Sequence, residues 1–326
     1  MKVGIIGIGS IAPNHIRGIK ECGHEIVALC DVEIEKCEKA NERSKLTARI
    51  YKDYKEMLDK EQLDVIHICT PHYLHAEMIC EGLNRNINVL SEKPLAINQE
   101  QLDQIERAVK KSKAQLGICF QNHYNASVLF VKDYLKDKEI TCASANLIWN
   151  RDAKYYAQAE WRGTWAQEGG GVMINQAIHS LDLLQWICGM PESVIAHTHN
   201  VALKNQIEVE DTAFGLFKMK NGTNFVLMAT NSASATFPIY YMFKADGHTV
   251  QLSSNNILID GEHMAKTDNI PLFGKEVWGV GHSKLIEDFY RCVQSGEKFA
   301  IDFYEASKSI KLLLAMYRSN GEEIKI

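Results

Sequence analysis

Residues 2–12 read KVGIIGIGSIA, where a short apolar run leads into closely spaced glycines. The run predicts a buried strand, and the apolar periodicity of residues 11–22 predicts a helix. This alternation of short apolar runs with amphipathic segments continues to about residue 120. It predicts a parallel sheet that is covered by helices on both faces. Further strands are expected at 25–31, 64–71, 87–94 and 114–120, and further helices at 32–44, 75–86 and 98–113.

The glycines in this stretch lie at a turn from strand to helix, which predicts a dinucleotide-binding site. Gly7 permits the tight turn, Gly9 lets the backbone approach a pyrophosphate, and Ala12 is small where the helix meets the strand. Amides at the start of the helix, near Ser10 and Ile11, are then expected to face the phosphates.

The second predicted strand ends at Asp31, about 20 residues after the glycines, where a carboxylate can bind an adenosine ribose. The residues after it, VEIEKCE, begin with acids and contain no arginine for a 2′-phosphate, which favours NAD over NADP. Ligands of such sheets bind at the carboxyl ends of the strands. The remaining cofactor-binding residues are therefore expected at Thr70, Pro71, His72, His75, Glu92, Lys93 and Gln121.

A metal site is not expected in this region. His67 lies within a predicted strand, and no cluster of carboxylates or thiolates joins it, His72 and His75 in a tetrahedral set.

The rest of the chain predicts a second domain of α+β type with a mostly antiparallel open sheet. The turn KNGT at 220–223 indicates a hairpin between two strands. We therefore divide the chain into a Rossmann-type domain at 1–120 and a substrate-binding and oligomerisation domain at 121–326. Its strands are expected at 140–149, 194–203, 211–220, 223–231 and 239–246, and its helices near 126–137, 281–295 and 303–319.

Residues 169–182, GGGVMINQAIHSLD, combine three glycines with polar side chains in an apolar helix. Asn175, His179 and Asp182 share one helical face. This face is either a satisfied polar patch in a core or the lining of a site. For Asp182 two roles stay open, which are orienting His179 and satisfying buried backbone.

Composition and charge narrow the function classes. The formal net charge of −5 gives no support to nucleic-acid binding. The nine cysteines form no CxxC pair, so free thiols in a reducing compartment are expected. With no secretory leader pattern and no apolar run near ~20 residues, we expect a cytoplasmic protein that binds no membrane.

The ordered motifs of the chain resemble the glucose–fructose oxidoreductase/inositol dehydrogenase (Gfo/Idh/MocA) family. They are GIGSIAPNH, Asp31, CTPHYLH, SEKP, CFQNHYN, the WRG at 161–163 and the glycine-led helix that carries His179. The resemblance spans essentially the whole chain. It implies a Rossmann domain, a second domain on an open sheet, and NAD(P)-dependent oxidation or reduction of sugars and polyols. It also implies homodimers or homotetramers that pack through the carboxy-terminal sheet.

Carried over by position, Lys93 matches the lysine of the family's E-K-P motif and His179 matches its catalytic histidine. Two positions depart from the family pattern. Asn175 replaces an aspartate, and the Q-N-R turn reads Gln121, Asn122, His123.

The chemistry expected of these residues is proton transfer beside a nicotinamide. His179 titrates in the range suited to an acid or base. Lys93 would bind the reacting oxygen or, with its pKa lowered by oxidised nicotinamide, accept the proton itself. Asn175 completes the catalytic set by positioning a hydroxyl. Substrate contacts are expected from Lys93, His123, Trp161, Arg162, Asn175 and His179.

These expectations lead to an NAD-dependent dehydrogenase of a sugar, inositol or related polyol. Two alternatives are an NAD-dependent glycosidase that oxidises its sugar transiently and a non-catalytic NAD-binding sensor.

Overall fold

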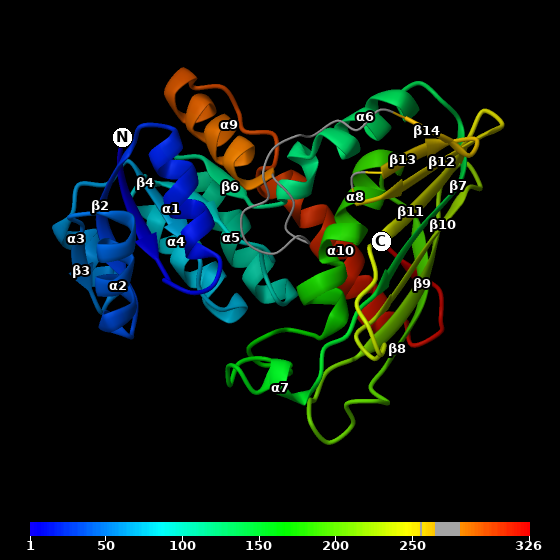
Figure 1. Cartoon of the computed structure of the whole chain (residues 1–326), viewed down its shortest axis with the longest axis horizontal. Helices are drawn as coiled ribbons and strands as arrows, with labels where there is room; N and C mark the ends of the chain where they lie inside the picture. Colours follow the sequence, from blue (N-terminus) through cyan, green and yellow to red (C-terminus); the bar gives the residue numbers. More distant parts are fainter. Residues whose placement is uncertain (255, 265–280) are drawn as a thin grey trace. The chain divides into compact units, whose positions relative to one another are not determined.

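The computed structural model describes residues 1–254, 256–264 and 281–326, and the chain divides into two compact units (Figure 1). The first unit consists of residues 1–121 together with residues 281–307. The second consists of residues 122–254, 256–264 and 308–326. In the described part of the chain, no helix is long and apolar enough to cross a membrane.

The first unit contains a six-stranded, wholly parallel sheet in the order β3-β2-β1-β4-β5-β6, which confirms the expected Rossmann-type fold. All four residues of β4 are buried, as expected for a strand covered on both faces. The strands are β1 (Lys2–Ile6), β2 (Glu25–Cys30), β3 (Arg49–Tyr51), β4 (Val65–Ile68), β5 (Asn88–Ser91) and β6 (Leu116–Ile118). The helices are α1 (Ala12–Glu21), α2 (Ile34–Ser44), α3 (Tyr54–Lys60), η1 (His72–Leu74), α4 (His75–Asn84), α5 (Gln99–Lys111) and α9 (Gly281–Ser295).

The helix α9 follows the second sheet in the sequence but belongs to the first unit, where it lies beside α1 (Figure 1). The two helices approach closely at Gly18, where an added Cβ would lie 2.6 Å from the Cδ1 of Ile286. A second close approach occurs at Gly117, where an added Cβ would lie 2.8 Å from the ring of Phe289. Two glycines therefore allow α9 to pack against α1 and the sheet.

The second unit is built on a nine-stranded sheet in the order β14-β13-β12-β11-β7-β10-β9-β8-β15. All neighbouring pairs are antiparallel except β7 and β10, and the expected hairpin joins β9 to β10. The strands are β7 (Ile140–Ile148), β8 (Ser193–His199), β9 (Thr212–Lys218), β10 (Asn224–Thr230), β11 (Tyr240–Ala245), β12 (His248–Ser253), β13 (Asn256–Ile259), β14 (Glu262–His263) and β15 (Ile324–Lys325). The remaining helices of the described residues are η2 (Gln121–Tyr124), α6 (Ala126–Leu135), α7 (Ala153–Tyr156), η3 (Met173–Ala177), α8 (Ile178–Cys188) and α10 (Phe303–Ser319).

The glycine-led segment is less regular than a single α-helix. Gly169 and Gly170 have positive φ angles of 84° and 148°, so they precede the helix rather than begin it. A π-helical turn, η3, then leads into α8, which packs against β7. Such π-turns are frequent at functional sites.

Candidate active site

The glycine turn of the first unit connects β1 to α1, and its two glycines serve different purposes. Gly7 has a φ of +88°, and an added Cβ would lie 2.7 Å from the carbonyl of Cys69. An added Cβ at Gly9 would meet nothing nearer than the Cys69 oxygen at 4.0 Å. Gly7 is therefore required by the turn and its packing, whereas the space at Gly9 suits a close ligand. The first turn of α1 has no side-chain cap, so its amides suit an anion, as expected at Ser10 and Ile11.

Asp31 holds this turn in place. One carboxylate oxygen accepts the amide of Ile8 at 2.7 Å, and the other accepts the amide of Glu33 at 2.9 Å. A carboxylate has about four acceptor sites, so these two bonds leave capacity for a ribose hydroxyl.

The loops after β4 and β5 are joined by His75. Its Nδ1 lies 2.8 Å from the carbonyl oxygen of Pro94, and its Nε2 lies 2.9 Å from that of Thr70. The ring is completely buried, and burial lowers its pKa. His75 thus acts as a clamp between two loops that carry predicted cofactor residues. His72 is also buried, whereas Thr70 and Pro71 are partly exposed.

Lys93 is the one residue between Val89 and Ile97 that is not buried. The preceding Glu92 is buried, and its Oε2 accepts the backbone amide of Lys93 at 3.3 Å. Despite burial, hydrogen bonds from His15 and His282 hold the pKa of Glu92 well below its usual value. The segment therefore presents a lysine beside a buried carboxylate.

Gln121 follows β6 at the same carboxyl edge of the sheet, and it is 3% exposed. Its Oε1 atom is buried and has no hydrogen-bond partner among the described residues. An orphaned buried oxygen is expected where a side chain binds a ligand, so Gln121 and the open side of Gly9 both fit a bound dinucleotide.

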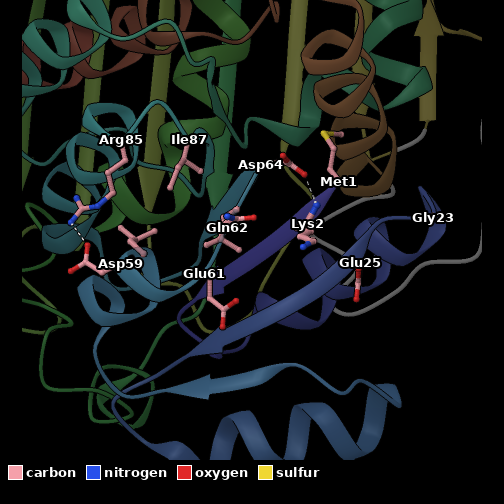
Figure 2. Close-up of a pocket in the computed structure, with 12 residues that line it drawn as sticks. Met1, Lys2, Gly23, Glu25, Asp59, Glu61, Gln62, Asp64, Arg85 and Ile87 are labelled. Carbon is pink, nitrogen blue, oxygen red and sulfur yellow. Dashed lines mark hydrogen bonds and ion pairs between the residues drawn. The ribbon is translucent and has the colours of Figure 1, made fainter.

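A surface hollow of about 980 Å³ lies at the opposite edge of this sheet, where the strands begin (Figure 2). Its lining includes Lys2 at the start of β1 and Glu25 at the start of β2. Figure 2 shows the Lys2 amide bonded to Asp64 and the Arg85 guanidinium paired with Asp59. Since nucleotides bind at the carboxyl ends, we do not assign this hollow to the cofactor.

In the second unit, Asn175 and His179 are the two residues between 168 and 185 that are not buried. Both lie on the segment formed by η3 and α8. This exposure distinguishes the two readings of the helix, because a satisfied core patch would leave neither side chain accessible. The third polar residue, Asp182, is 1% exposed and points elsewhere.

The triple glycine makes room for Glu210 and Tyr317. An added Cβ at Gly171 would overlap the backbone oxygen of Glu210, and one at Gly170 would overlap the Tyr317 hydroxyl. The Glu210 carboxylate accepts the amides of Gly171 at 2.9 Å and Met173 at 3.0 Å. Glu210 therefore caps the helix that carries the candidate site. Burial raises the pKa of Glu210 to about 7.

Glu168 explains the asparagine at position 175. Its carboxylate is completely buried, and it accepts hydrogen bonds from the backbone amide of Gly163 and the side-chain amide of Asn175. An aspartate at 175 would place two carboxylates in contact, which burial makes costly. Asparagine donates to Glu168 and is held in one orientation.

Asp182 is paired with His123 rather than with backbone. Its Oδ2 lies 2.5 Å from the Nε2 of His123, and its Oδ1 accepts the Ser309 hydroxyl at 2.8 Å. The His123 ring stacks on Trp186 at 3.9 Å and is 5% exposed. The structure therefore gives His123 a buried structural contact, and its expected contact with substrate stays a prediction.

Trp161 and Arg162 lie in the loop between α7 and the glycines. The Arg162 guanidinium lies over the rings of Tyr155 and Trp161, at 4.5 and 4.7 Å, and it donates to the Tyr155 hydroxyl at 2.6 Å. The Tyr155 hydroxyl also accepts the Gln176 amide at 3.1 Å, next to Asn175. This network connects the aromatic loop to the helix of the candidate site.

The sequence analysis did not single out Glu168, Glu210 or His15. Glu210 and His15 act through distant partners, Gly171 and Glu92, whereas Glu168 meets Asn175 only seven residues along the chain, through an irregular turn. No local pattern of residues signals such pairs.

The fold and these residues define a two-unit protein whose first unit is a Rossmann-type nucleotide-binding domain. Residues 1–120 match the oxidoreductase family with an NAD-binding Rossmann fold, and residues 139–250 match the Gfo/Idh/MocA carboxy-terminal domain. The chain belongs to the Gfo/Idh/MocA family, and its first domain is an NAD-binding Rossmann domain.

Known relatives include several dehydrogenases. Inositol 2-dehydrogenase of Salmonella paratyphi B is 26% identical over 57% of this chain and 54% of its own length, so the chain spans about half of that relative. Myo-inositol 2-dehydrogenase of Thermotoga maritima is 21% identical over 99% of this chain and 97% of its own. Among solved structures, the WlbA dehydrogenase from Bordetella pertussis, in complex with NADH and UDP-GlcNAcA, superposes with a TM-score of 0.89. It is 28% identical over 100% of this chain and 97% of that chain.

Proposed function

We propose that this protein is an NAD-dependent dehydrogenase that transfers hydride between nicotinamide and a hydroxyl-bearing carbon of a sugar, inositol or related polyol. Lys93, Asn175 and His179 are its catalytic residues. The observation that carries the proposal is selective exposure: Lys93 alone is accessible within 89–97, and Asn175 and His179 alone within 168–185. Polar groups kept accessible in otherwise buried segments are expected where a ligand is bound.

When bound, NAD supplies the hydride acceptor. The chain must then take the proton of the substrate hydroxyl and hold its oxygen. His179 is the acid or base in this scheme, and Lys93 stabilises negative charge on the oxygen. Asn175, oriented by Glu168, positions the hydroxyl. Lys93 is the alternative proton acceptor, and alanine variants of Lys93 and His179 test each role.

A specific observation favours acidic sugars within this class. Arg151 and Arg162 both lie over Tyr155, at 5.1 and 4.5 Å. The Nε atoms of both arginines are buried and have no hydrogen-bond partner in the described part of the chain. Two such guanidinium groups suit a carboxylate or phosphate. The UDP-GlcNAcA in the WlbA complex is consistent with this preference.

The test is a substrate panel with spectroscopic detection. Purified protein and NAD are mixed with inositols, neutral aldoses, sugar acids and nucleotide-linked sugar acids, and the absorbance of reduced nicotinamide is recorded. Turnover of any member supports the dehydrogenase, and a higher kcat/KM for the acids supports the arginine subsite. NAD binding without turnover across the whole panel would contradict the proposal.

The two alternative functions receive no support from the relatives, which are named dehydrogenases and oxidoreductases. Release of aglycone from a chromogenic glycoside, with no accumulation of reduced cofactor, would revive the glycosidase. A non-catalytic sensor would bind NAD without turning over any substrate. Substitution of both Lys93 and His179 would leave its NAD affinity unchanged.

We also propose a homodimer or homotetramer that packs through the sheet of the second unit. Phe214 on β9 is 46% exposed, and Val226 and Met228 on β10 are 41% and 37% exposed. Phe214 pairs with Met228 in the sheet, so these side chains form a continuous apolar patch. Exposed apolar patches on a sheet are typical of interfaces.

A further inference from the structure

A chain of buried polar side chains crosses the first unit and ends at the residue before Lys93. The Tyr290 hydroxyl of α9 lies 2.8 Å from the Nε2 of His67 on β4. The Nδ1 of His67 lies 2.7 Å from the Nδ1 of His15 on α1. The Nε2 of His15 lies 3.0 Å from the Oε1 of Glu92. His282, also on α9, lies 3.5 Å from the same oxygen.

These groups are shielded from water. His15 and His67 are completely buried, Tyr290 is 2% exposed and Glu92 is 7% exposed. A buried chain of this kind is stable only if each link has one donor and one acceptor.

With both imidazoles neutral and Glu92 ionised, one arrangement of protons satisfies all three links. Its carboxylate can only accept, so His15 must carry its proton on Nε2. The Nδ1 of neutral His15 then accepts, so His67 must carry its proton on Nδ1. The Nε2 of His67 accepts in turn, and the Tyr290 hydroxyl donates to it. Both imidazoles are neutral in this order, as burial of His67 favours, because it lowers the pKa of that ring well below its usual value.

We propose that Tyr290, His67 and His15 form a directional hydrogen-bond relay that holds Glu92 as a carboxylate and thereby positions Lys93. The inference rests on the proposed function for the role of Lys93, whereas the order of protons stands independently of it. The Oε1 of Glu92 accepts the hydrogen bond from His15, and its Oε2 accepts the backbone amide of Lys93. Tyr290, His67 and His15 are positioning residues, because they act on Lys93 through Glu92.

The other titratable groups around Glu92 do not compete for this role. They come from several elements, namely His282 on α9, His75 on α4, Cys69 after β4, Cys119 after β6 and Lys93 itself. Burial holds the pKa of both thiols well above the usual value, so they stay protonated. His282 and Lys93 add favourable positive charge or donors when they are protonated, which further favours the carboxylate.

A metal ion is the competing interpretation of this cluster. Ligand atoms of His15, Glu92 and Cys119 lie within 4.8 Å of one another. Hydrogen bonds already use both nitrogens of His15 and the Oε1 of Glu92. The relay therefore accounts for these contacts without a further group.

The first test is independent of activity. Protein labelled with ¹⁵N in histidine is studied by long-range ¹H–¹⁵N correlation between pH 5.5 and 8.5, with signals assigned from His15→Gln and His67→Gln. The relay requires a proton on Nε2 of His15 and on Nδ1 of His67, and no titration of either ring. Titration of both rings near pH 6.5, the opposite tautomers, or one equivalent of transition metal in the purified protein would overturn it.

The second test uses turnover by the whole enzyme. Tyr290→Phe keeps the ring but removes the first donor, so kcat is expected to fall roughly tenfold, while KM and NAD affinity stay within twofold. The acidic limb of the pH profile of kcat should move toward higher pH. His15→Gln keeps a donor for Glu92 and should retain more activity than His15→Leu. Unchanged pH profiles in Tyr290→Phe and His15→Leu would overturn the role of the relay.

Tyr51→Phe is the matched control. It removes a buried tyrosine hydroxyl in the same unit that donates to Glu61 at 2.5 Å, outside the relay. A purely structural effect would move both tyrosine variants alike. If the wild-type enzyme turns over no sugar while the histidine tautomers agree, the proposed function fails and the order of protons stands.

Discussion

The two units each bury a carboxylate next to a candidate catalytic segment, and they treat the two groups in opposite ways. In the first unit, imidazoles surround Glu92 and hold its pKa well below the usual value. In the second, backbone amides and a hydroxyl surround Glu210, and burial raises its pKa to about 7. Equal burial therefore gives opposite pKa shifts, because imidazoles donate to Glu92, whereas only backbone amides and a hydroxyl donate to Glu210 among the described residues.

The difference suggests a division of labour. The carboxylate of Glu92 lies beside Lys93, so its charge is expected to affect the proposed role of Lys93 in the reaction. Glu210 instead stabilises the backbone conformation, since it caps the π-turn of the segment that carries Asn175 and His179.

The largest effect is expected for the proposed catalytic groups themselves. Lys93→Ala and His179→Ala should each lower kcat by roughly 10²–10⁴-fold, while NAD affinity stays within several-fold. Stopped-flow turnover and fluorescence titration with NAD measure the two quantities. Lys60→Ala, at an exposed ion pair with Glu56, serves as the control. Equal losses of turnover and NAD affinity in Lys93→Ala would make that lysine a cofactor-binding residue instead.

A pair of glycine substitutions separates shape from ligand approach. Gly171→Ala forces a Cβ into the Glu210 backbone, and we expect a loss of about 3 kcal/mol in the free energy of unfolding. Gly9→Ala has open space around its Cβ, so stability should be kept while NAD affinity falls at least about tenfold. Chemical denaturation and NAD titration of both variants provide the comparison. If Gly171→Ala were as stable as the wild type, the account of the triple glycine would be wrong.

The raised pKa of Glu210 makes a stability prediction with a definite sign. The folded state binds this proton more tightly than the unfolded state, so the contribution is present below about pH 4.5 and is lost as pH rises through about 7. Between pH 5 and 8 the wild type should lose about 2 kcal/mol relative to Glu210→Gln, which does not titrate. Denaturation midpoints across this range measure the slope. A flat difference between the two proteins would show that Glu210 does not titrate on unfolding in this range.

The smallest effect on fold and turnover is expected at the outer face of the second sheet. Val226→Asp should shift the proposed oligomer toward monomer, while kcat per subunit changes less than about twofold. Light scattering after size-exclusion chromatography measures the mass. Val201→Asp, at a loop residue that is 74% exposed, should leave the mass unchanged. An unaltered oligomer in Val226→Asp, or a monomeric wild type, would contradict the proposed interface.

The sequence predicted the structural elements that are determined by residues close together in the chain. The glycine turn, the parallel strands and the hairpin at 220–223 all follow from neighbouring residues, and the structure confirms these elements. The prediction was incomplete where side chains meet across long separations. Asp31 could be recognised by its spacing, but its bond to the Ile8 amide could not.

The second unit illustrates the same limit. The helical spacing grouped Asp182 with Asn175 and His179, yet Asp182 pairs with His123, 59 residues earlier. The π-turn changes which side chains face the same way, and it depends on the capping carboxylate of Glu210, 39 residues beyond Gly171. Pattern alone carries no information about such partners.

The position of α9 in the sequence has a consequence for how the protein is made. Tyr290 and His282, which complete the surroundings of His67 and Glu92, are synthesised after nearly nine-tenths of the chain. Until then, residues 1–121 lack Ile286 and Phe289, which pack against Gly18 and Gly117. The first unit therefore completes its packing only after α9 has been synthesised, and a fragment that ends at residue 121 contains the glycine turn but lacks Tyr290 and His282.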